Sequence, residues 1–164
     1  MKTLMLLRHA KSSWKDSDLA DHDRPLNKRG KKTAPQMGRL LSAEGLMPDL
    51  ILSSTAVRAR QTAEAVAHSS SYEGPIELLD SLYLAPPGKL LGEVSTRTPD
   101  SVVRVLVVGH NPGLEDLVEI LSGTRHAFPT GALAVFELGI DRWNSLELGI
   151  EAKLSKIYRP KELE

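Results

Sequence analysis

Two histidines and two arginines of this chain are spaced so that they could form one anion-binding site. Arg8 and His9 are adjacent near the N-terminus, Arg58 lies in the segment Ser-Ser-Thr-Ala-Val-Arg, and His110 lies in Gly-His-Asn-Pro. Guanidinium groups bind phosphoryl oxygens through paired hydrogen bonds. An imidazole with a pKa near ~6.5 is largely unprotonated at pH 7, so it can act as a nucleophile. Together, these side chains suit a dianionic phosphoryl group.

Each of these clusters follows a short apolar run that is typical of a buried strand. The runs are Lys2–Leu7, Asp49–Ser53 and Val102–Val108, and a further short strand is expected at Ile76–Leu79. In a parallel sheet the carboxyl ends of the strands meet at one edge, where α/β proteins bind ligands. A single histidine at a strand end is usually an ordinary polar loop residue. Two histidines and two arginines at the same edge favour a functional site.

Helical segments are expected between these strands. Asn27 can cap a helix that runs to about Glu44 and stops at Gly45, although Pro35 favours a start nearer Ala34. Further helices are expected after a cap at Ser54 or Thr55, near Lys89–Thr96, and from Asn111-Pro112 to Leu121, with terminal strands at Leu133–Leu138 and Leu146–Ile157. The alternation predicts an α/β fold, a single three-layer domain whose mainly parallel central sheet is flanked by helices.

The composition is that of an ordinary globular domain. The chain has 164 residues, with 41% hydrophobic and 26% charged residues, which argues against disorder. Cysteine is absent, so disulfides and thiolate nucleophiles are excluded. No apolar run approaches the roughly 20 residues of a membrane span, and the N-terminal run is too short for a signal peptide. A cytoplasmic protein without a membrane partner is therefore expected.

Charge is unevenly distributed, although the net charge is zero. Residues 1–32 hold nine Lys and Arg against four Asp and Glu, whereas residues 61–164 hold nine against fifteen. The basic N-terminal region favours an anionic ligand, with a solvated charged face as the ordinary alternative. Nucleic acid is not expected as a partner, because aromatic residues make up only 4% and no basic stripe with stacking side chains occurs.

Three segments resemble the signatures of the histidine phosphatase superfamily, which is also called phosphoglycerate mutase-like. Leu7–Ala10 resembles its Arg-His-Gly signature, Ser53–Ala63 its second-arginine segment, and Val107–Leu114 its second-histidine segment. The segments occur in the family's order and cover most of the chain. Five further segments resemble the small SixA-type phosphohistidine phosphatases: Arg8–Trp14, Asp23–Leu26, Arg29–Gly30, Leu82–Ala85 and Pro129–Leu133.

The resemblance implies one histidine phosphatase domain over residues 1–164, without a cap insertion, and a covalent mechanism. His9 is then the nucleophile that attacks phosphorus, and water hydrolyses the resulting phosphohistidine. Arg8, Arg58 and His110 are implied to hold the phosphoryl group and stabilise the transition state. No metal or other cofactor is expected, because the arginines supply the positive charge.

The chain departs from the family where relatives carry a general acid. Asn111 and Ser81 occupy those positions, and Asp80 is the neighbouring candidate acid. An alkoxide leaving group needs such an acid, whereas a leaving imidazole needs it far less, because its nitrogen protonates near neutral pH. The departure favours a phosphohistidine-bearing protein, such as a phosphotransfer domain, as substrate. The change from glycine to Ala10 is mild.

Other candidates and alternative functions remain open. Lys15 is a candidate phosphate contact, as are Asn111 and the free amides of the helix that follows it. Ser12 and Thr130 could line the pocket, and Arg24 could pair with acids of its loop. The rival functions are a small-molecule phosphomonoesterase, a non-catalytic module that binds a phosphorylated ligand, and a mutase.

Overall fold

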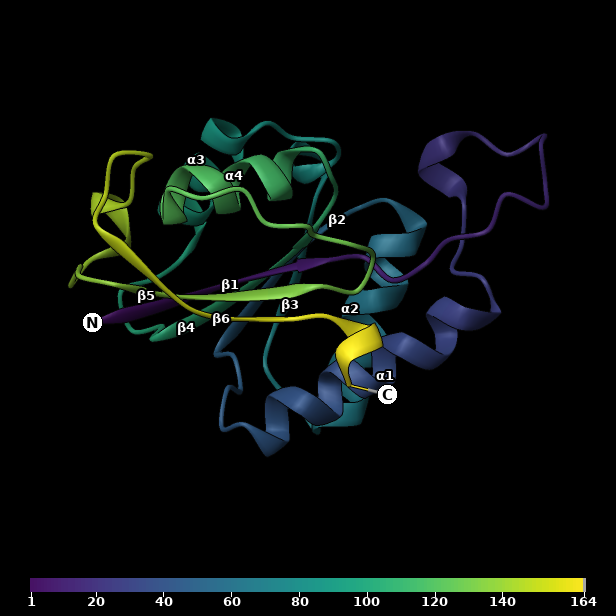
Figure 1. Ribbon diagram of the computed structural model, residues 1–164, viewed down its shortest axis with the longest axis horizontal. Coiled ribbons are helices and arrows are strands. Elements are labelled where there is room, and N and C mark those ends of the chain that lie inside the picture. The colour runs from purple at the N-terminus through teal and green to yellow at the C-terminus, as the bar shows by residue number, and fades with distance from the viewer. Residues whose placement is uncertain (164) are drawn as a thin grey trace.

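A six-stranded sheet with two helices on each face forms the molecule, seen in a computed structural model that describes residues 1–163 (Figure 1). The strands are β1 (Lys2–Arg8), β2 (Leu50–Ser54), β3 (Ile76–Leu79), β4 (Arg104–Gly109), β5 (Leu133–Leu138) and β6 (Ala152–Tyr158). The helices are α1 (Lys28–Ala43), α2 (Val57–Ser70), α3 (Pro87–Arg97) and α4 (Gly113–Ser122). Short 3-10 turns lie at Asp21–Asp23, Asp80–Leu82, Trp143–Ser145 and Pro160–Glu162.

The sheet has the strand order β3-β2-β4-β1-β5-β6. Its first four strands are parallel, whereas β5 is antiparallel to β1 and β6 is antiparallel to β5. The parallel strands are connected through helices, as such crossovers require. This confirms the α/β fold and the mainly parallel central sheet that the sequence predicts.

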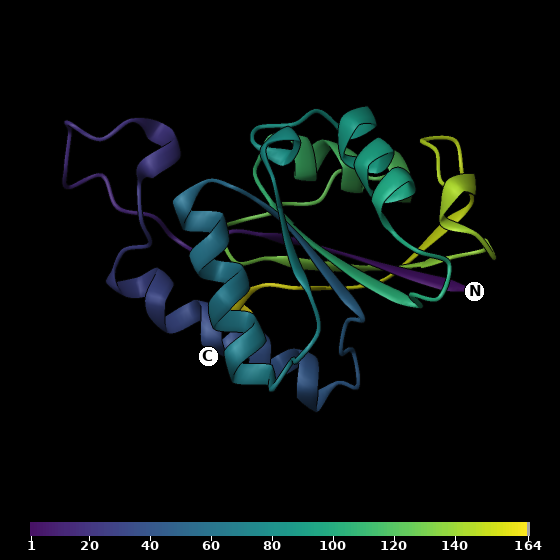
Figure 2. The ribbon, with the colours of Figure 1, turned by 180° about the vertical axis from the view of Figure 1, so that it is seen from behind.

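Both faces of the sheet are buried along β1, β2, β4 and β5, and alternate residues of β1 serve opposite faces. In β1, Leu4 and Leu6 pack in the cluster that contains α3 and α4, while Met5 and Leu7 pack in the cluster that contains α1 and α2. Figures 1 and 2 show these two helix pairs on opposite sides of the sheet. Burial on both faces explains why the strands read as continuous apolar runs rather than alternating ones.

Helix α1 corrects the expected start near Ala34. The helix begins at Lys28, and the side chain of Asn27 accepts a hydrogen bond of 2.8 Å from the backbone N–H of Gly30. Pro35 lies inside the helix. A proline there costs about 3 kcal/mol, but burying Met37 and Leu41 contributes roughly 1.5–3 kcal/mol each. The cap and the buried face therefore outweigh the proline.

The expected terminal strand over 146–157 is only partly correct. Its first half is irregular, and β6 begins at Ala152. The cause is Trp143, which is fully buried and donates a 2.8 Å hydrogen bond from its indole to the carbonyl of Val102. The buried Trp143 lies in a 3-10 turn, and residues 146–151 connect this turn to β6. None of the helices within residues 1–163 has the length and apolar content to span a bilayer.

The N-cap of α1 gives a first test of the fold. Replacing Asn27 by alanine removes the side-chain acceptor of the Gly30 N–H, so we expect Asn27→Ala to lower the free energy of unfolding by about 0.5–2 kcal/mol in urea titrations. Lys32→Ala, on the exposed face of the same helix, is the control and should change it by less than about 0.5 kcal/mol. Equal stability of the parent and Asn27→Ala would contradict this role for the cap.

Candidate active site

Strand pairing brings the predicted residues to one edge of the sheet. Arg8, the last residue of β1, pairs with Gly109, the last residue of β4, so His9 and His110 follow neighbouring strands at the same level. The backbone N–H of His9 also donates to the carbonyl of Gly109, at 3.0 Å. The centroids of the two imidazole rings are 5.2 Å apart. The expected meeting of these side chains at the carboxyl edge is therefore observed.

A cavity of about 420 Å³ opens at this edge, and we refer to it as the catalytic pocket. Its walls are formed by Arg8, His9, Lys11, Ser12, Trp14, Asp21, Arg24, Arg58, Leu84, His110, Asn111 and Thr130. All four residues of the predicted cluster are included. Ser12 and Thr130 line it as expected, whereas the candidate Lys15 is exposed and does not. The lysine that lines the cavity is Lys11, which the sequence analysis did not single out.

The hydrogen bond of the His9 ring defines its tautomer. Nδ1 lies 2.7 Å from the carbonyl oxygen of Ala10. A carbonyl only accepts, so Nδ1 carries the hydrogen and Nε2 keeps a free lone pair. Burial, with Arg58 and Arg8 nearby, lowers the pKa of His9 to about 4, so the ring is neutral at pH 7. His9 therefore offers a neutral nitrogen nucleophile inside the catalytic pocket.

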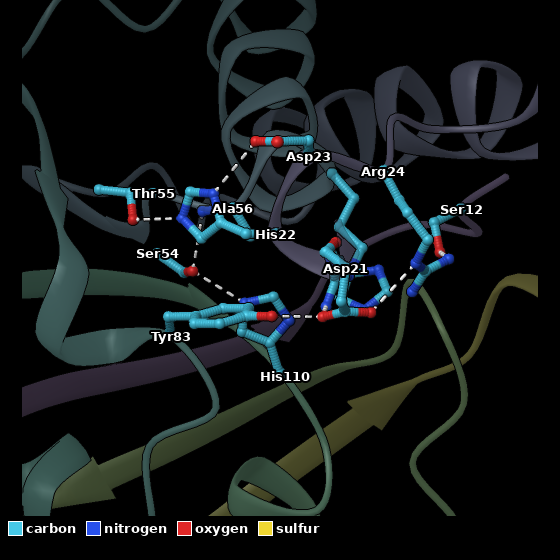
Figure 3. Close-up of polar contacts among 12 residues, drawn as sticks. Ser12, Asp21, His22, Asp23, Arg24, Ser54, Thr55, Ala56, Tyr83 and His110 are labelled. Carbon is cyan, nitrogen blue, oxygen red and sulfur yellow. Dashed lines mark hydrogen bonds and ion pairs between the residues drawn. The ribbon is translucent and has the colours of Figure 1, made fainter. Parts of the chain in front are cut away.

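His110 is held by a serine that follows β2. Its Nε2 lies 2.8 Å from Oγ of Ser54, and Figure 3 shows Ser54 pointing at the ring. If Ser54 donates its hydroxyl proton to Nε2, the hydrogen of the neutral ring is on Nδ1. Burial, followed by the neighbouring His9 and Arg58, lowers the pKa of His110 to about 3. Its Nδ1 is buried and has no hydrogen-bond partner within residues 1–163.

The serine's engagement also changes the start of α2. The N-cap of α2 is Ala56, and no side chain caps the helix. Oγ of Ser54 instead accepts a 3.2 Å hydrogen bond from the N–H of Ala56 and contacts His110. Thr55 donates its hydroxyl to Asp80, at 2.6 Å. The expected cap at Ser54 or Thr55 is therefore wrong, because both side chains bind partners outside the helix.

Both arginines keep a buried N–H available. Arg58 is 3% exposed and donates from its terminal nitrogens to the carbonyl and carboxylate of Asp21, at 2.7 and 3.0 Å. Arg8 donates to the carbonyl of Phe128, at 3.2 Å. Nε of each arginine is buried and has no hydrogen-bond partner among the described residues, like Nδ1 of His110. Buried donors without acceptors are costly, so the two guanidinium Nε–H groups, from residues that both line the catalytic pocket, indicate a place for an anion.

Asp21 is the carboxylate of the catalytic pocket that sequence reasoning missed. It accepts hydrogen bonds from Tyr83, Arg24 and Arg58, and Figure 3 shows it between Tyr83 and Arg24. The Tyr83 hydroxyl first, then Arg24 and Arg58, lower its pKa to about 2, so Asp21 is ionised at pH 7. Pairing of Arg24 with its own loop was expected and is confirmed. The coupling to Arg58, which is distant in sequence, left no local signal.

Asp80 lies outside the catalytic pocket. Its side chain is exposed and accepts the hydrogen bond from Thr55, whose hydroxyl also lies 2.9 Å from Nε2 of His22. Asp80 does not line the cavity, so this geometry does not favour the predicted role of Asp80 as the acid. Asp23 contacts the other ring nitrogen of His22, at 3.6 Å. The loop residues 21–23 therefore serve separate partners.

Asn111 lines the catalytic pocket, but the backbone N–H groups of the helix that follows it already have hydrogen-bond acceptors at Leu114 and Glu115. Helix α4 begins at Gly113, and the N–H groups of Leu114 and Glu115 donate to the carbonyl of His110 and to Oδ1 of Asn111, at 3.0 and 3.3 Å. The amide of Asn111 donates to the carbonyl of Phe128, at 2.9 Å. The amides of Leu114 and Glu115 are therefore not free to bind an anion, because the chain itself satisfies them.

Comparison with known proteins places this geometry in a family. The model of the histidine phosphatase superfamily (branch 1) matches residues 4–83. An uncharacterised protein of Mycobacterium tuberculosis is 40% identical over 157 residues, which cover 89% of this chain and 95% of that one. An uncharacterised chloroplastic protein of Arabidopsis thaliana is 35% identical over 150 residues, covering 87% of this chain and 69% of that one.

Solved structures agree with this. A protein assigned as the phosphohistidine phosphatase SixA of Agrobacterium tumefaciens superposes with a TM-score of 0.82 at 32% identity, covering 97% of this chain and 98% of that one. A SixA structure complexed with tungstate has the same fold, with a TM-score of 0.83 at 24% identity and 99% of both chains covered. The chain therefore belongs to the histidine phosphatase superfamily and is of the SixA type.

The two buried histidines predict a pH dependence of stability. Their pKa values are lowered in the folded state, so the unfolded chain binds protons first as the pH falls below about 6.5. Stability is therefore fully present above pH 6.5 and is lost as the pH falls toward about 4 for His9 and about 3 for His110. We expect the free energy of unfolding to drop by up to about 1.4 kcal/mol per pH unit for each histidine.

Chemical denaturation at a series of pH values measures this dependence. The His9→Gln/His110→Gln double variant should have a much flatter profile between pH 6.5 and 4.5, because glutamine does not titrate. His68→Gln, at an exposed position near the end of α2, is the matched control and should retain the parent slope. A parent profile that is already flat would contradict the lowered pKa values.

Proposed function

We propose that this chain hydrolyses phosphohistidine on a protein through a phosphohistidine formed on its own His9. The observation that carries the proposal is the state of Asp21, the carboxylate on the wall of the catalytic pocket. Three donors keep it ionised, so it holds no proton to give to an alkoxide leaving group. Phosphohistidine does not need that proton from a carboxyl group, because its leaving nitrogen protonates near neutral pH.

In the first step, Nε2 of His9 attacks phosphorus. A bond from Nε2 to phosphorus forms while the bond from phosphorus to the substrate nitrogen breaks, and the leaving imidazole takes a proton from solvent. The His9 ring gains positive charge, which the Nδ1–H···O=C bond to Ala10 stabilises. Water then attacks the phosphoryl group, releasing inorganic phosphate and restoring neutral His9.

The phosphoryl oxygens are bound by the buried donors of the catalytic pocket. We infer that the Nε–H groups of Arg8 and Arg58 donate to these oxygens, as does Nδ1–H of His110 when Ser54 donates to Nε2, because these atoms have no partner within residues 1–163. Asn111 would form part of the pocket wall, where the hydrogen bond from its side-chain amide to the carbonyl of Phe128 orients it. The two guanidiniums supply positive charge that stabilises the transition state, so the proposed reaction requires no metal ion.

The family relationship supports the substrate class. The Agrobacterium tumefaciens protein, at 32% identity, is assigned as a phosphohistidine phosphatase. A second protein assigned as SixA, from Nakamurella multipartita, is also 32% identical, with a TM-score of 0.80. We propose by extension that the substrate is a phosphotransfer domain or a similar protein that carries phosphohistidine.

Replacing the nucleophile gives the direct test. We expect His9→Ala to abolish turnover of a phosphohistidine peptide, because the covalent intermediate can no longer form, while far-ultraviolet circular dichroism stays that of the parent. His22→Ala, a histidine outside the catalytic pocket, is the control and should form the intermediate normally. Quenching the parent under alkaline conditions and mapping the phosphate by mass spectrometry should locate it on His9. Phosphate on any other residue would overturn the assignment.

Leaving-group dependence tests the missing acid. We expect phosphohistidine to be turned over fastest, aryl phosphates more slowly and alkyl phosphates slowest, since only the first leaving group protonates unaided at pH 7. Asp80→Asn should change phosphohistidine turnover far less than the roughly 10²–10⁴-fold that loss of a general acid costs. If alkyl phosphates are preferred and Asp80→Asn removes that preference, Asp80 is an acid and the chain is a phosphomonoesterase.

A further inference from the structure

A second cavity adjoins the catalytic pocket and has no part in the mechanism above. It has a volume of about 670 Å³, and four of its lining residues, Arg8, Lys11, Asn111 and Thr130, also line the catalytic pocket. The two cavities therefore form one continuous depression. A substrate whose phosphoryl group lies at His9 would extend directly into the second cavity.

Two separate parts of the chain form the outer wall of this cavity. Arg29 and Thr33 come from the first turns of α1, and Arg159 and Lys161 come from the segment that follows β6. Figures 1 and 2 both show the C-terminal turn beside α1. We refer to the cavity as the basic groove, defined by Lys11, Arg29, Arg159 and Lys161.

The two carboxylates that line the groove within residues 1–163 are already engaged. Glu115 binds Arg125 at 2.9 Å and accepts a hydrogen bond from the N–H of Phe128, at 3.0 Å. Glu162 binds Arg159 at 3.3 Å. The groove therefore presents more positive than negative charge to an incoming ligand, next to a pocket that already selects an anion.

We propose that the basic groove binds acidic side chains that flank the phosphohistidine on the substrate protein. This inference rests on the proposed function, because it places the phosphohistidine at His9. Carboxylates of the partner would meet Lys11 and Lys161, whose side chains are exposed and can adjust to them. Charges at such a rim act mainly on the rate of encounter and on the choice of partner.

A protein segment fits this surface better than a small second ligand does. Pockets for small molecules are mostly apolar and enclose most of the ligand, whereas the cations here project into solvent. Trp14 and Leu84 on the wall of the catalytic pocket are 75% and 52% exposed, which leaves large apolar side chains for a partner to cover. Tryptophan is among the residues that dominate the binding energy of protein interfaces.

Synthetic peptides with one central phosphohistidine test the proposal. Three peptides carry flanks of glutamate, serine or lysine, and free phosphohistidine serves as the probe without flanks. We expect kcat/KM for the glutamate peptide to exceed that for the lysine peptide by about tenfold or more at low salt. The difference should shrink strongly between about 0.05 M and about 0.5 M salt, because exposed charges are screened.

Charge reversal in the groove links this preference to the structure. Lys161→Glu should lower kcat/KM for the glutamate peptide by roughly threefold to tenfold. Turnover of free phosphohistidine should stay unchanged. Lys153→Glu is the matched control. Lys153 lies opposite Glu137 in the β5–β6 register, and Glu137 lies opposite Thr3 near the start of β1, so Lys153 is at the end of the sheet away from the groove. The control variant should leave all four substrates unaffected.

The outcomes separate the two proposals. If no phosphohistidine substrate is turned over while a phosphate ester is, the proposed function falls, and the assignment of the groove falls with it. If the three peptides are hydrolysed equally well, the function stands and the groove proposal is overturned. If Lys161→Glu slows free phosphohistidine as much as the glutamate peptide, the groove contacts the phosphohistidine itself and not the residues that flank it.

Discussion

Parallel pairing between β1 and β4 is the constraint on which the site depends. The register that sets Arg8 opposite Gly109 also places His9 and His110 side by side, with their rings 5.2 Å apart. A shift of one residue would turn every side chain of β1 to the other face and exchange Leu4 and Leu6 for Met5 and Leu7 in the two core clusters. The same apolar contacts that stabilise the sheet therefore hold the two imidazoles in place.

Burial gives these groups their chemistry. The pocket keeps both histidines neutral beside two charged arginines, because burial lowers the pKa of each imidazole below its value in water. The cost of burying Arg58 is offset by Asp21, which receives hydrogen bonds from Tyr83 and Arg24 as well. Stability and function are thus coupled, since the contacts that keep Arg58 buried also hold it at the place where a phosphoryl oxygen would bind.

Local patterns predicted most of the fold and the four central site residues, because apolar runs mark buried strands and strand ends mark the ligand edge. Three features were missed: the start of α1 ahead of Pro35, the turn around Trp143, and the hydrogen bonds that the amides after Asn111 make. Contacts outside the local sequence pattern decide each of them. Asp21 was missed as a pocket residue for the same reason. Its partner Arg58 is distant in sequence, so no local spacing reveals the pair.

The bond between Asp21 and Arg58 also bears on how long the product stays. A bound phosphate shares the Arg58 guanidinium with a carboxylate that is already ionised, so two anions stand beside one cation. Their mutual repulsion weakens the hold on inorganic phosphate. On the proposed function it weakens the hold less on the transferring phosphoryl group, which is metaphosphate-like in a loose transition state and carries less negative charge than inorganic phosphate. On the proposed function, this repulsion favours release of inorganic phosphate from the pocket over storage of the phosphoryl group.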